Sequence, residues 1–149
     1  PRPLMLHIPQ SVIDEMTAHA RSIDPVECCG IMAGTTSEED ATVTHIYPIK
    51  NGDASIVSYF MDPKELLWAH KNMRSNTLDL LVIYHSHTHT QAYPSATDIR
   101  LAFYPEAHYI IISLEVKDQP DIKAFRIVDG KIAPAEFSII NPATKLAGD

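Results

Sequence analysis

The pattern of apolar and polar positions in the first third of the chain predicts a short strand, a helix and a strand hairpin. Residues 4–7 have an extended character, and the segment 9–22 has the period of a helix. Its apolar face comprises Val12, Ile13, Met16 and Ala20. The apolar run 27–33 is closed by a glycine and a polar stretch, which is typical of a buried strand followed by a turn. Residues 41–49 are its expected hairpin partner.

The middle of the chain alternates strand and helix signals. A strand is expected at 58–61, and Asp62 followed by proline then marks the start of a helix that ends near Arg74. The run 78–86 is almost entirely apolar until it ends in histidine, as expected of a central strand that is covered on both faces.

The last third of the chain continues this mixture, with a third helix expected at 95–103. Three strands are expected to follow, at 107–114, 122–128 and 135–140. Asp129 and Gly130 supply the turn between the last two strands, and the final eight residues are expected to fray. Together these elements predict one α/β (α+β) domain, residues 1–149, in which helices flank a mixed central β-sheet.

Composition and charge narrow the classes of function. A chain of 149 residues with 45% hydrophobic and 21% charged residues is ordinary for one globular domain. Its apolar runs fall far short of the roughly 20 residues of a membrane helix. The start of the sequence does not resemble a secretory signal, so a cytoplasmic location is expected. The formal net charge of -7 argues against nucleic acid or anionic membranes as partners, because both require clustered Lys and Arg.

The two cysteines cannot connect distant parts of the fold. Cys28 and Cys29 are adjacent, and neighbouring cysteines close only a strained ring. Because disulfides are also rare in the cytosol, we expect two reduced, buried thiols. A nucleophilic role for Cys29 would require an activating histidine, which the sequence does not identify.

The stretch from His85 to Asp98 carries the candidate chemistry. His85, His87 and His89 alternate at the end of a predicted strand, and alternate residues on a strand point in the same direction. His85 and His87 can therefore present two imidazoles to one metal ion, and Asp98 can add a carboxylate from the first turn of the next helix. Two histidines, one carboxylate and an open fourth position form the ligand pattern of a catalytic zinc, whereas structural zinc sites close all four positions.

Simpler explanations exist for each part of this stretch. A His-x-His sequence also occurs by chance in packed or solvated strands, because short motifs have many false matches. Ser95 and Asp98 could form only a capping box at the start of a helix. His89 could be a further ligand or a loop residue beside the site. The spacing of the complete set favours the metal site.

With these residues in this order, the sequence resembles the JAMM, or MPN+, metalloprotease family. That family's pattern is His-x-His, seven residues, Ser, two residues and Asp, which is met here by His85, His87, Ser95 and Asp98. A glutamate far upstream, on an early strand before Cys-Gly, completes the pattern, and Glu27 occupies that position. The resemblance extends from the first helix to about residue 128. It implies a single JAMM/MPN domain of the cytidine-deaminase-like fold, with Zn2+ as its cofactor.

The resemblance also implies roles for two residues that bind no metal. Glu27 would accept a proton from the attacking water and pass it to the leaving amine. Ser95 would donate a hydrogen bond to the oxygen that becomes negatively charged, a contribution of about 3 kcal/mol. The alternative for Glu27 is a surface salt bridge, but it directly precedes a segment expected to be buried. The remaining histidines are expected to be packed or exposed, namely His7, His19, His45, His70 and His108.

Within the family, the chain most resembles the small actinobacterial Mec+ type. The similar segments are 84–88, 92–95, 105–109 and 126–130. This resemblance implies a zinc peptidase that releases cysteine from the C-terminal glycine of a ubiquitin-like sulfur-carrier protein during cysteine biosynthesis. Two alternatives stay open, namely a broader deubiquitinase-like or desampylase isopeptidase and a non-catalytic MPN scaffold. A homodimer is also left open.

Overall fold

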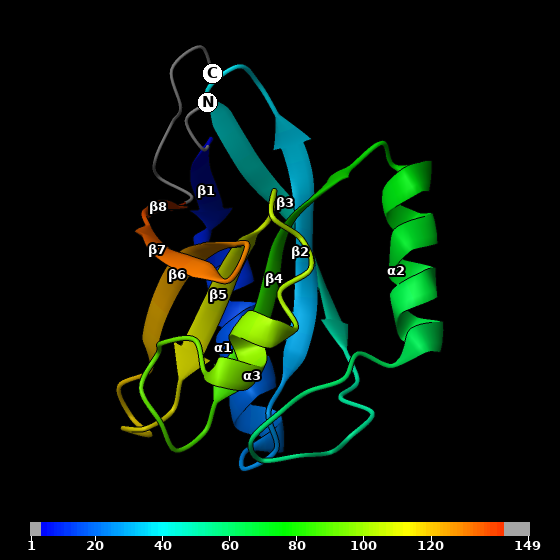
Figure 1. Ribbon diagram of the computed structural model, residues 1–149. Coiled ribbons are helices and arrows are strands. Elements are labelled where there is room, and N and C mark those ends of the chain that lie inside the picture. The colour runs from blue at the N-terminus through cyan, green and yellow to red at the C-terminus, as the bar shows by residue number, and fades with distance from the viewer. Residues whose placement is uncertain (1–3, 142–149) are drawn as a thin grey trace.

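One mixed β-sheet forms the body of this computed structural model, which describes residues 4–141 (Figure 1). The helices are α1 (Gln10–Ile23), α2 (Pro63–Ser75) and α3 (Ala96–Arg100). The strands are β1 (Met5–Pro9), β2 (Cys29–Thr36), β3 (Asp40–Ile49), β4 (Asp79–His87), β5 (His108–Ser113), β6 (Asp121–Val128), β7 (Lys131–Ala135) and β8 (Phe137–Ile140). Between residues 4 and 141 the predicted α+β architecture with three helices and a mixed sheet is confirmed.

The strands form a single eight-stranded sheet in the order β7-β6-β5-β4-β2-β3-β1-β8. Strand β1 runs parallel to β3 and β8, β4 runs parallel to β5, and the other neighbours are antiparallel. Although β7 and β8 lie at opposite edges, only Glu136 separates them in sequence. The sheet must therefore curl until its two edges meet, as Figure 1 shows.

Side chains alternate between the two faces of the central strands and build a core on each face. Met32 and Val82 pack with the buried side of α1, whereas Ile31 and Ile83 face the opposite side. Helix α2 covers part of that opposite side through Ala69 and Met73. The central strands are thus buried on both faces, which explains why nearly every residue from 78 to 84 is apolar.

Side-chain caps fix where α2 and α3 begin. The Asp62 carboxylate accepts a hydrogen bond from the Glu65 N–H at 3.0 Å, and proline follows at the first helical position, as predicted. Ser95 and Asp98 form a reciprocal capping box at the start of α3. No helix within the described residues is long and apolar enough to span a membrane.

Two predicted strands differ from the structure. Residues 58–61 form no strand and contribute only an isolated bridge between Met61 and Asn51. The Asn51 side chain binds the backbone of Ser58 and Phe60, where a ladder would need a partner strand. The strand expected at 135–140 corresponds to β8, and the prediction missed β7 (Lys131–Ala135), which follows the turn directly. The chain passes from one edge of the curled sheet to the other at Glu136, between these two strands.

The bounds of two other elements also shift. Strand β2 begins at Cys29 rather than at residue 27, so Glu27 lies just before the strand. Helix α3 ends at Arg100 rather than near residue 103, after a single capped turn or so. The Asp129-Gly130 turn is confirmed, and both of its residues have the positive φ that such a hairpin requires. The expected fraying of the last eight residues lies outside the described residues.

We predict that Gly34→Ala destabilises the fold. A Cβ at Gly34 would collide with the backbone carbonyl of Thr42 on β3, at the irregularity where the β2–β3 register shifts. Backbone atoms cannot rotate away, so the free energy of unfolding should fall by about 1–3 kcal/mol. Thermal unfolding measures this loss, with Gly52→Ala as the control, because a Cβ there makes only ordinary contact with the Phe60 ring. Equal melting temperatures for the two variants would contradict the prediction.

Candidate metal centre

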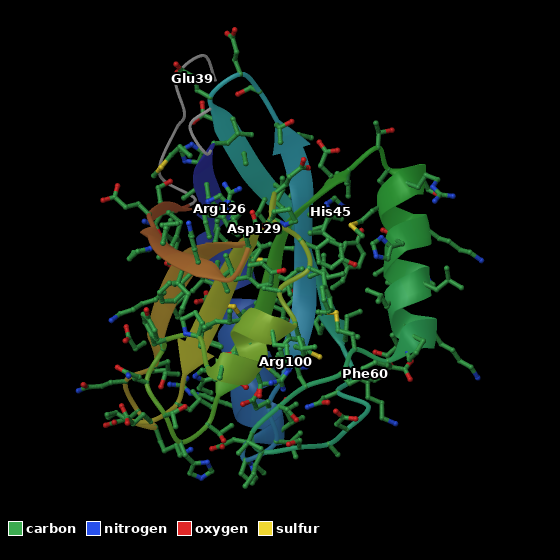
Figure 2. The ribbon with its side chains drawn as sticks, in the orientation of Figure 1. Glu39, His45, Phe60, Arg100, Arg126 and Asp129 are labelled. Carbon is green, nitrogen blue, oxygen red and sulfur yellow. The ribbon has the colours of Figure 1, made fainter. Side chains whose placement is uncertain are left out.

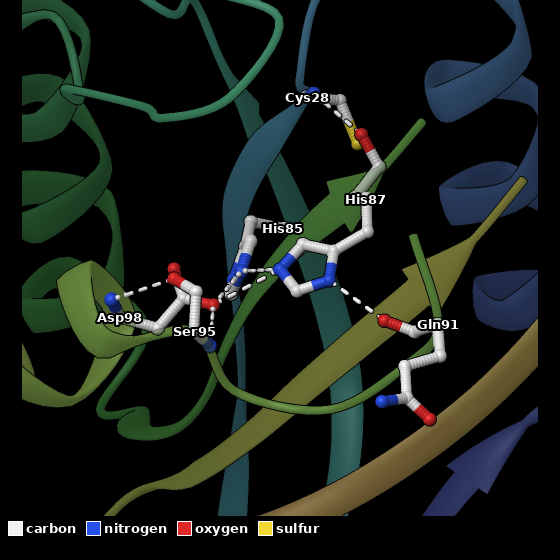
Figure 3. Close-up of polar contacts among 7 residues, drawn as sticks. Cys28, His85, His87, Gln91, Ser95 and Asp98 are labelled. Carbon is white, nitrogen blue, oxygen red and sulfur yellow. Dashed lines mark hydrogen bonds and ion pairs between the residues drawn. The ribbon is translucent and has the colours of Figure 1, made fainter. Parts of the chain in front are cut away.

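Three candidate ligand atoms converge at the end of β4 (Figure 3). The Nε2 atoms of His85 and His87 lie 3.2 Å apart. The Asp98 Oδ2 atom lies 3.1 Å from His85 Nε2 and 2.9 Å from His87 Nε2. The sequence-predicted metal set is therefore brought together at one point, and both histidines are almost fully buried.

Each ligand is aimed by the element that carries it. His85 and His87 alternate along β4, so both imidazoles lie on the same face of the sheet. Asp98 occupies the third position of α3, where its Oδ2 atom also accepts a hydrogen bond from the Ser95 N–H at 2.9 Å. The capping box and the candidate metal site thus share one carboxylate, and the two interpretations of Ser95 and Asp98 are compatible.

The arrangement around the histidines leaves nitrogen lone pairs for a cation. His87 Nδ1 lies 2.8 Å from the backbone carbonyl of Gln91 and donates to it, so a metal ion that displaces the second ring proton would bind at Nε2, the nitrogen that faces Asp98. The His85 ring is held instead by stacking on Tyr59, with centroids 4.7 Å apart. Neither Gln91 nor Tyr59 was identified from the sequence, because a backbone carbonyl and a loop aromatic carry no motif.

The spacing of the three donor atoms fits a zinc ion. In a tetrahedral site with bonds of about 2.0–2.1 Å, two ligand atoms are separated by roughly 3.3 Å. The separations of 3.2, 3.1 and 2.9 Å are close to this value. Two imidazole nitrogens and one carboxylate oxygen also match the donor set of a catalytic zinc, which keeps one position open.

Glu27 reaches this site through the pairing of β2 with β4. Cys29 is paired with His85, and the Ser86 N–H continues the ladder by donating to the Cys28 carbonyl at 3.1 Å. Extending this antiparallel register places Glu27 opposite His87, on the face that holds the metal ligands. Glu27 is only 4% exposed, which excludes the alternative of a surface salt bridge.

The two carboxylates of the site have pKa values shifted in opposite directions, upward for Glu27 and downward for Asp98. Burial raises the pKa of Glu27 to about 7, with the charge of His87 opposing the rise and that of Asp98 adding to it. Burial alone would also raise the pKa of Asp98, but hydrogen bonds from His85 and His87 hold it well below its usual range. The pKa of His87 is raised, because contact with Asp98 and Gln91 outweighs the effect of burial.

Ser95 lies at the exposed rim of the site. Its Oγ accepts a hydrogen bond from the Asp98 N–H at 3.1 Å and remains free to donate its own proton. Ser95 is therefore fixed in place by the capping box without using its donor.

The other candidates lie outside the ligand cluster. His89 is exposed and bonds to the Thr88 hydroxyl at 2.9 Å, so it is a loop residue beside the site rather than part of the three-residue group. His108 is buried, and burial together with Arg126 lowers its pKa to about 4. Cys28 and Cys29 are free and buried, as predicted, and burial raises the pKa of each thiol to about 12. Neither thiol is poised to act as a nucleophile.

An α+β domain with a two-histidine, one-carboxylate centre and a buried glutamate beside it has the features of a metal-dependent hydrolase. The sequence matches the family described as prokaryotic homologs of the JAB domain (Prok-JAB) over residues 9–128. The chain belongs to this family, whose JAMM-type character the sequence motifs predicted.

Curated relatives cover most of the chain. It is 37% identical over 136 residues to the CysO-cysteine peptidase of Mycobacterium tuberculosis, covering 91% of this chain and 92% of the relative. It is 32% identical over 129 residues to the probable TtuB-protein conjugate cleaving protease of Thermus thermophilus, covering 86% and 80%. It is 35% identical over 105 residues to the desampylase of Haloferax volcanii, covering 67% and 74%.

Solved structures support the same fold. A solution structure of a Desulfitobacterium hafniense protein matches with a TM-score of 0.81 and 40% identity, covering 92% of each chain. A solution structure of a Salinibacter ruber protein has a TM-score of 0.70 at 24% identity, covering 94% of this chain and 95% of that one, and shows likeness of fold alone.

We predict that the purified protein binds about one zinc ion per chain and that His87→Ala loses most of it. Removing one of three protein ligands leaves an incomplete catalytic set. Asp98→Asn should bind zinc more weakly than the parent, because an amide oxygen is a poorer ligand than a carboxylate. Metal analysis after dialysis measures both, with exposed His89→Ala as the control that retains zinc. Full zinc in a protein lacking both His85 and His87 would place the metal elsewhere.

We also predict that Glu27→Gln stabilises the metal-free protein at alkaline pH. The pKa of Glu27 is raised by folding, from an ordinary value of about 4.5 to about 7. The folded state therefore binds more protons between these pH values, and stability declines as pH rises through this window. Above pH 7 the free energy of unfolding of the variant should be about 1–3 kcal/mol higher than that of the parent. Denaturant unfolding with chelator present measures this, and the two proteins should be nearly equal at pH 4.

Proposed function

We propose that this protein is a zinc-dependent peptidase that hydrolyses the bond after the C-terminal glycine of a ubiquitin-like sulfur-carrier protein and releases cysteine. The observation that carries the proposal is the convergence of His85, His87 and Asp98 beside buried Glu27. The substrate class is supported by the 37% identity to a CysO-cysteine peptidase over nearly the whole chain. Because the complete ligand set is present, nothing favours a non-catalytic scaffold.

Each site residue then has a defined task. His85, His87 and Asp98 would hold the zinc, and when bound the metal acts as a Lewis acid that polarises the scissile carbonyl and lowers the pKa of water to about 7. Glu27 accepts a proton from the attacking water and delivers it to the leaving amine. The carbonyl carbon gains a bond to oxygen and loses its bond to nitrogen, so the products are a carboxylic acid and an amine.

Two local features suit Glu27 and Ser95 to these roles. Burial raises the pKa of Glu27 in the metal-free site, which makes this carboxylate a stronger base than an exposed glutamate and suits it to accept and return a proton. Ser95 keeps its hydroxyl proton available at the rim and donates it to the carbonyl oxygen as negative charge develops there. The Ser95 Oγ is held by the Asp98 N–H, so it needs no reorganisation during the reaction.

The relatives from Thermus thermophilus and Haloferax volcanii favour a second candidate, a broader isopeptidase that removes ubiquitin-like proteins from lysine side chains of their targets. The two candidates share the metal centre and differ in the leaving amine. For cysteine this is an α-amino group beside a carboxylate, whereas for a protein target it is a lysine side chain.

Mass spectrometry of the products tests the proposal. A carrier with cysteine joined to its C-terminal glycine should yield the free carrier and cysteine, and chelator should abolish the reaction until zinc is restored. A carrier joined to a lysine side chain should be cleaved more slowly. Equal rates on both substrates would favour the broader isopeptidase, and no cleavage of either by the zinc-loaded protein would contradict the proposed activity.

We predict that Glu27→Gln lowers kcat about a hundredfold or more while zinc content stays near that of the parent. The amide preserves size but cannot accept the proton. A matched control is Glu39→Gln at the tip of the β2–β3 hairpin, far from α3 (Figure 2). It should retain full activity. Unchanged kcat in Glu27→Gln would assign the general base to another residue.

A further inference from the structure

The orientation of the Glu27 carboxylate depends on its backbone. The Glu27 Oε1 atom is buried and has no hydrogen-bond partner among residues 4–141. A buried carboxylate without such a partner is free to rotate unless the main chain and the surrounding packing hold it. The groups that fix the Glu27 main chain therefore decide where the carboxylate lies relative to the metal ligands.

Two hydrogen bonds at the end of β4 hold the chain before and after Glu27, one made by Ser86 and one by Thr88, the residue after the strand. The Thr88 hydroxyl donates to the Pro25 carbonyl at 3.1 Å, and the Cys28 N–H donates to Ser86 Oγ at 2.8 Å. The backbone of Glu27 itself is held by a different part of the fold, the β3–α2 loop (residues 50–62).

Two residues of the β3–α2 loop bind the Glu27 backbone. The Glu27 N–H donates to the Ser55 carbonyl at 2.9 Å, and the Asn51 side chain donates from Nδ2 to the Glu27 carbonyl at 3.0 Å. Both main-chain groups of Glu27 are thus satisfied by this one loop. A displacement of this loop would therefore displace the backbone of Glu27, the proposed general base.

Asn51 is the residue that organises the loop. Its Nδ2 atom also donates to the Ser58 carbonyl at 3.0 Å, and its Oδ1 atom accepts from the N–H groups of Asp53 and Phe60 at 3.0 Å each. With the bond to Glu27, both side-chain donors and both acceptor positions are used, and this pattern fixes the amide orientation. Asn51 is only 5% exposed, so these bonds are shielded from competition with water.

The same amide also places the aromatic ring that lies against a metal ligand. Ser58 and Phe60, the two residues that Asn51 binds in the distal part of the loop, flank Tyr59 in sequence. Tyr59 stacks on His85 with an interplanar angle of 28°. One side chain therefore joins the backbone of the proposed base to the backbone that supports a ligand ring. Figure 2 labels Phe60 on this loop, on the side of the molecule between α3 and the start of α2.

We propose that Asn51 is a positioning residue that aligns Glu27 with the metal centre by joining its backbone carbonyl to the β3–α2 loop. This inference rests on the proposed function of Glu27 as the general base. Asn51 touches neither substrate nor metal in this role. Asn51 bonds directly to the Glu27 backbone, whereas it reaches His85 only indirectly, through the stacked ring of Tyr59. Most of its contribution to kcat therefore passes through Glu27, and removing Glu27 should remove that part.

A double-mutant cycle tests the coupling on the zinc-loaded protein with the carrier-cysteine substrate. Asn51→Ala should lower kcat about tenfold to a hundredfold, since small displacements of a reacting group have effects of this size, with KM changed less than about twofold. In a Glu27→Gln background the same substitution should change kcat by less than about twofold, because the base is already absent. Zinc content should match the parent in both backgrounds.

A matched control separates positioning from loss of stability. Asn72 is a second asparagine with a side-chain hydrogen bond, although it is less buried than Asn51, and its Oδ1 accepts from the Tyr47 hydroxyl at 2.6 Å. Asn72→Ala should lower the melting temperature but leave kcat near that of the parent. Amide hydrogen exchange of chelated protein gives a readout that does not depend on activity. The Glu27 N–H should exchange faster in Asn51→Ala, while the Ser86 N–H should not.

The outcomes distinguish failure of this inference from failure of the proposed function. If Glu27→Gln alone loses activity but Asn51→Ala lowers kcat by the same factor in both backgrounds, Asn51 does not act through Glu27 and the inference is wrong. If Glu27→Gln retains full activity, the assignment of the base is wrong, and the inference falls with it. If Asn51→Ala does not fold, Asn51→Asp is measured instead, because it keeps the acceptor oxygen and puts a carboxylate oxygen where the amide donated to the Glu27 and Ser58 carbonyls. Parent-like kcat in that variant would overturn the inference.

Discussion

The pairing of β2 with β4 is the interaction on which the site depends. These two buried strands meet in an antiparallel register that sets Cys29 against His85 and Gly30 against Tyr84. A slip of one residue would move the side chains of one strand to the opposite face. The glutamate that precedes β2 would then no longer lie on the face that carries His85 and His87. The apolar residues on both faces of these strands thus stabilise the register as well as the core.

The site concentrates buried polar groups at the end of the sheet, and this has an energetic cost. Glu27 is buried with a raised pKa, and two imidazoles lie within hydrogen-bond distance of the Asp98 carboxylate. Such groups are costly to remove from water unless they are paired with each other or with a cation. The capping box of α3 and the carbonyl of Gln91 offset part of that cost. A bound metal would offset more, because it binds the folded state and not the unfolded chain.

The β3–α2 loop positions residues of the site in addition to the strands and α3. The strands and α3 supply the candidate ligands, whereas the loop supplies the contacts to Glu27 and the ring that stacks on His85. Loops that carry function usually need a rigid framework, and here a single buried amide at Asn51 provides it. Substitutions in this loop could therefore alter the chemistry without touching any ligand.

Features that depend on short-range order could be predicted from the amino-acid sequence. The alternation of His85 and His87 on a strand, the capping box that carries Asp98, and the capped start of α2 follow from local geometry, and the structure contains them. Tertiary structure alone decided the division between β7 and β8, the irregular course of residues 58–61, and the contacts of Asn51, Gln91 and Tyr59. These depend on hydrogen bonds and packing between segments far apart in sequence, and such contacts leave no periodic pattern along the chain.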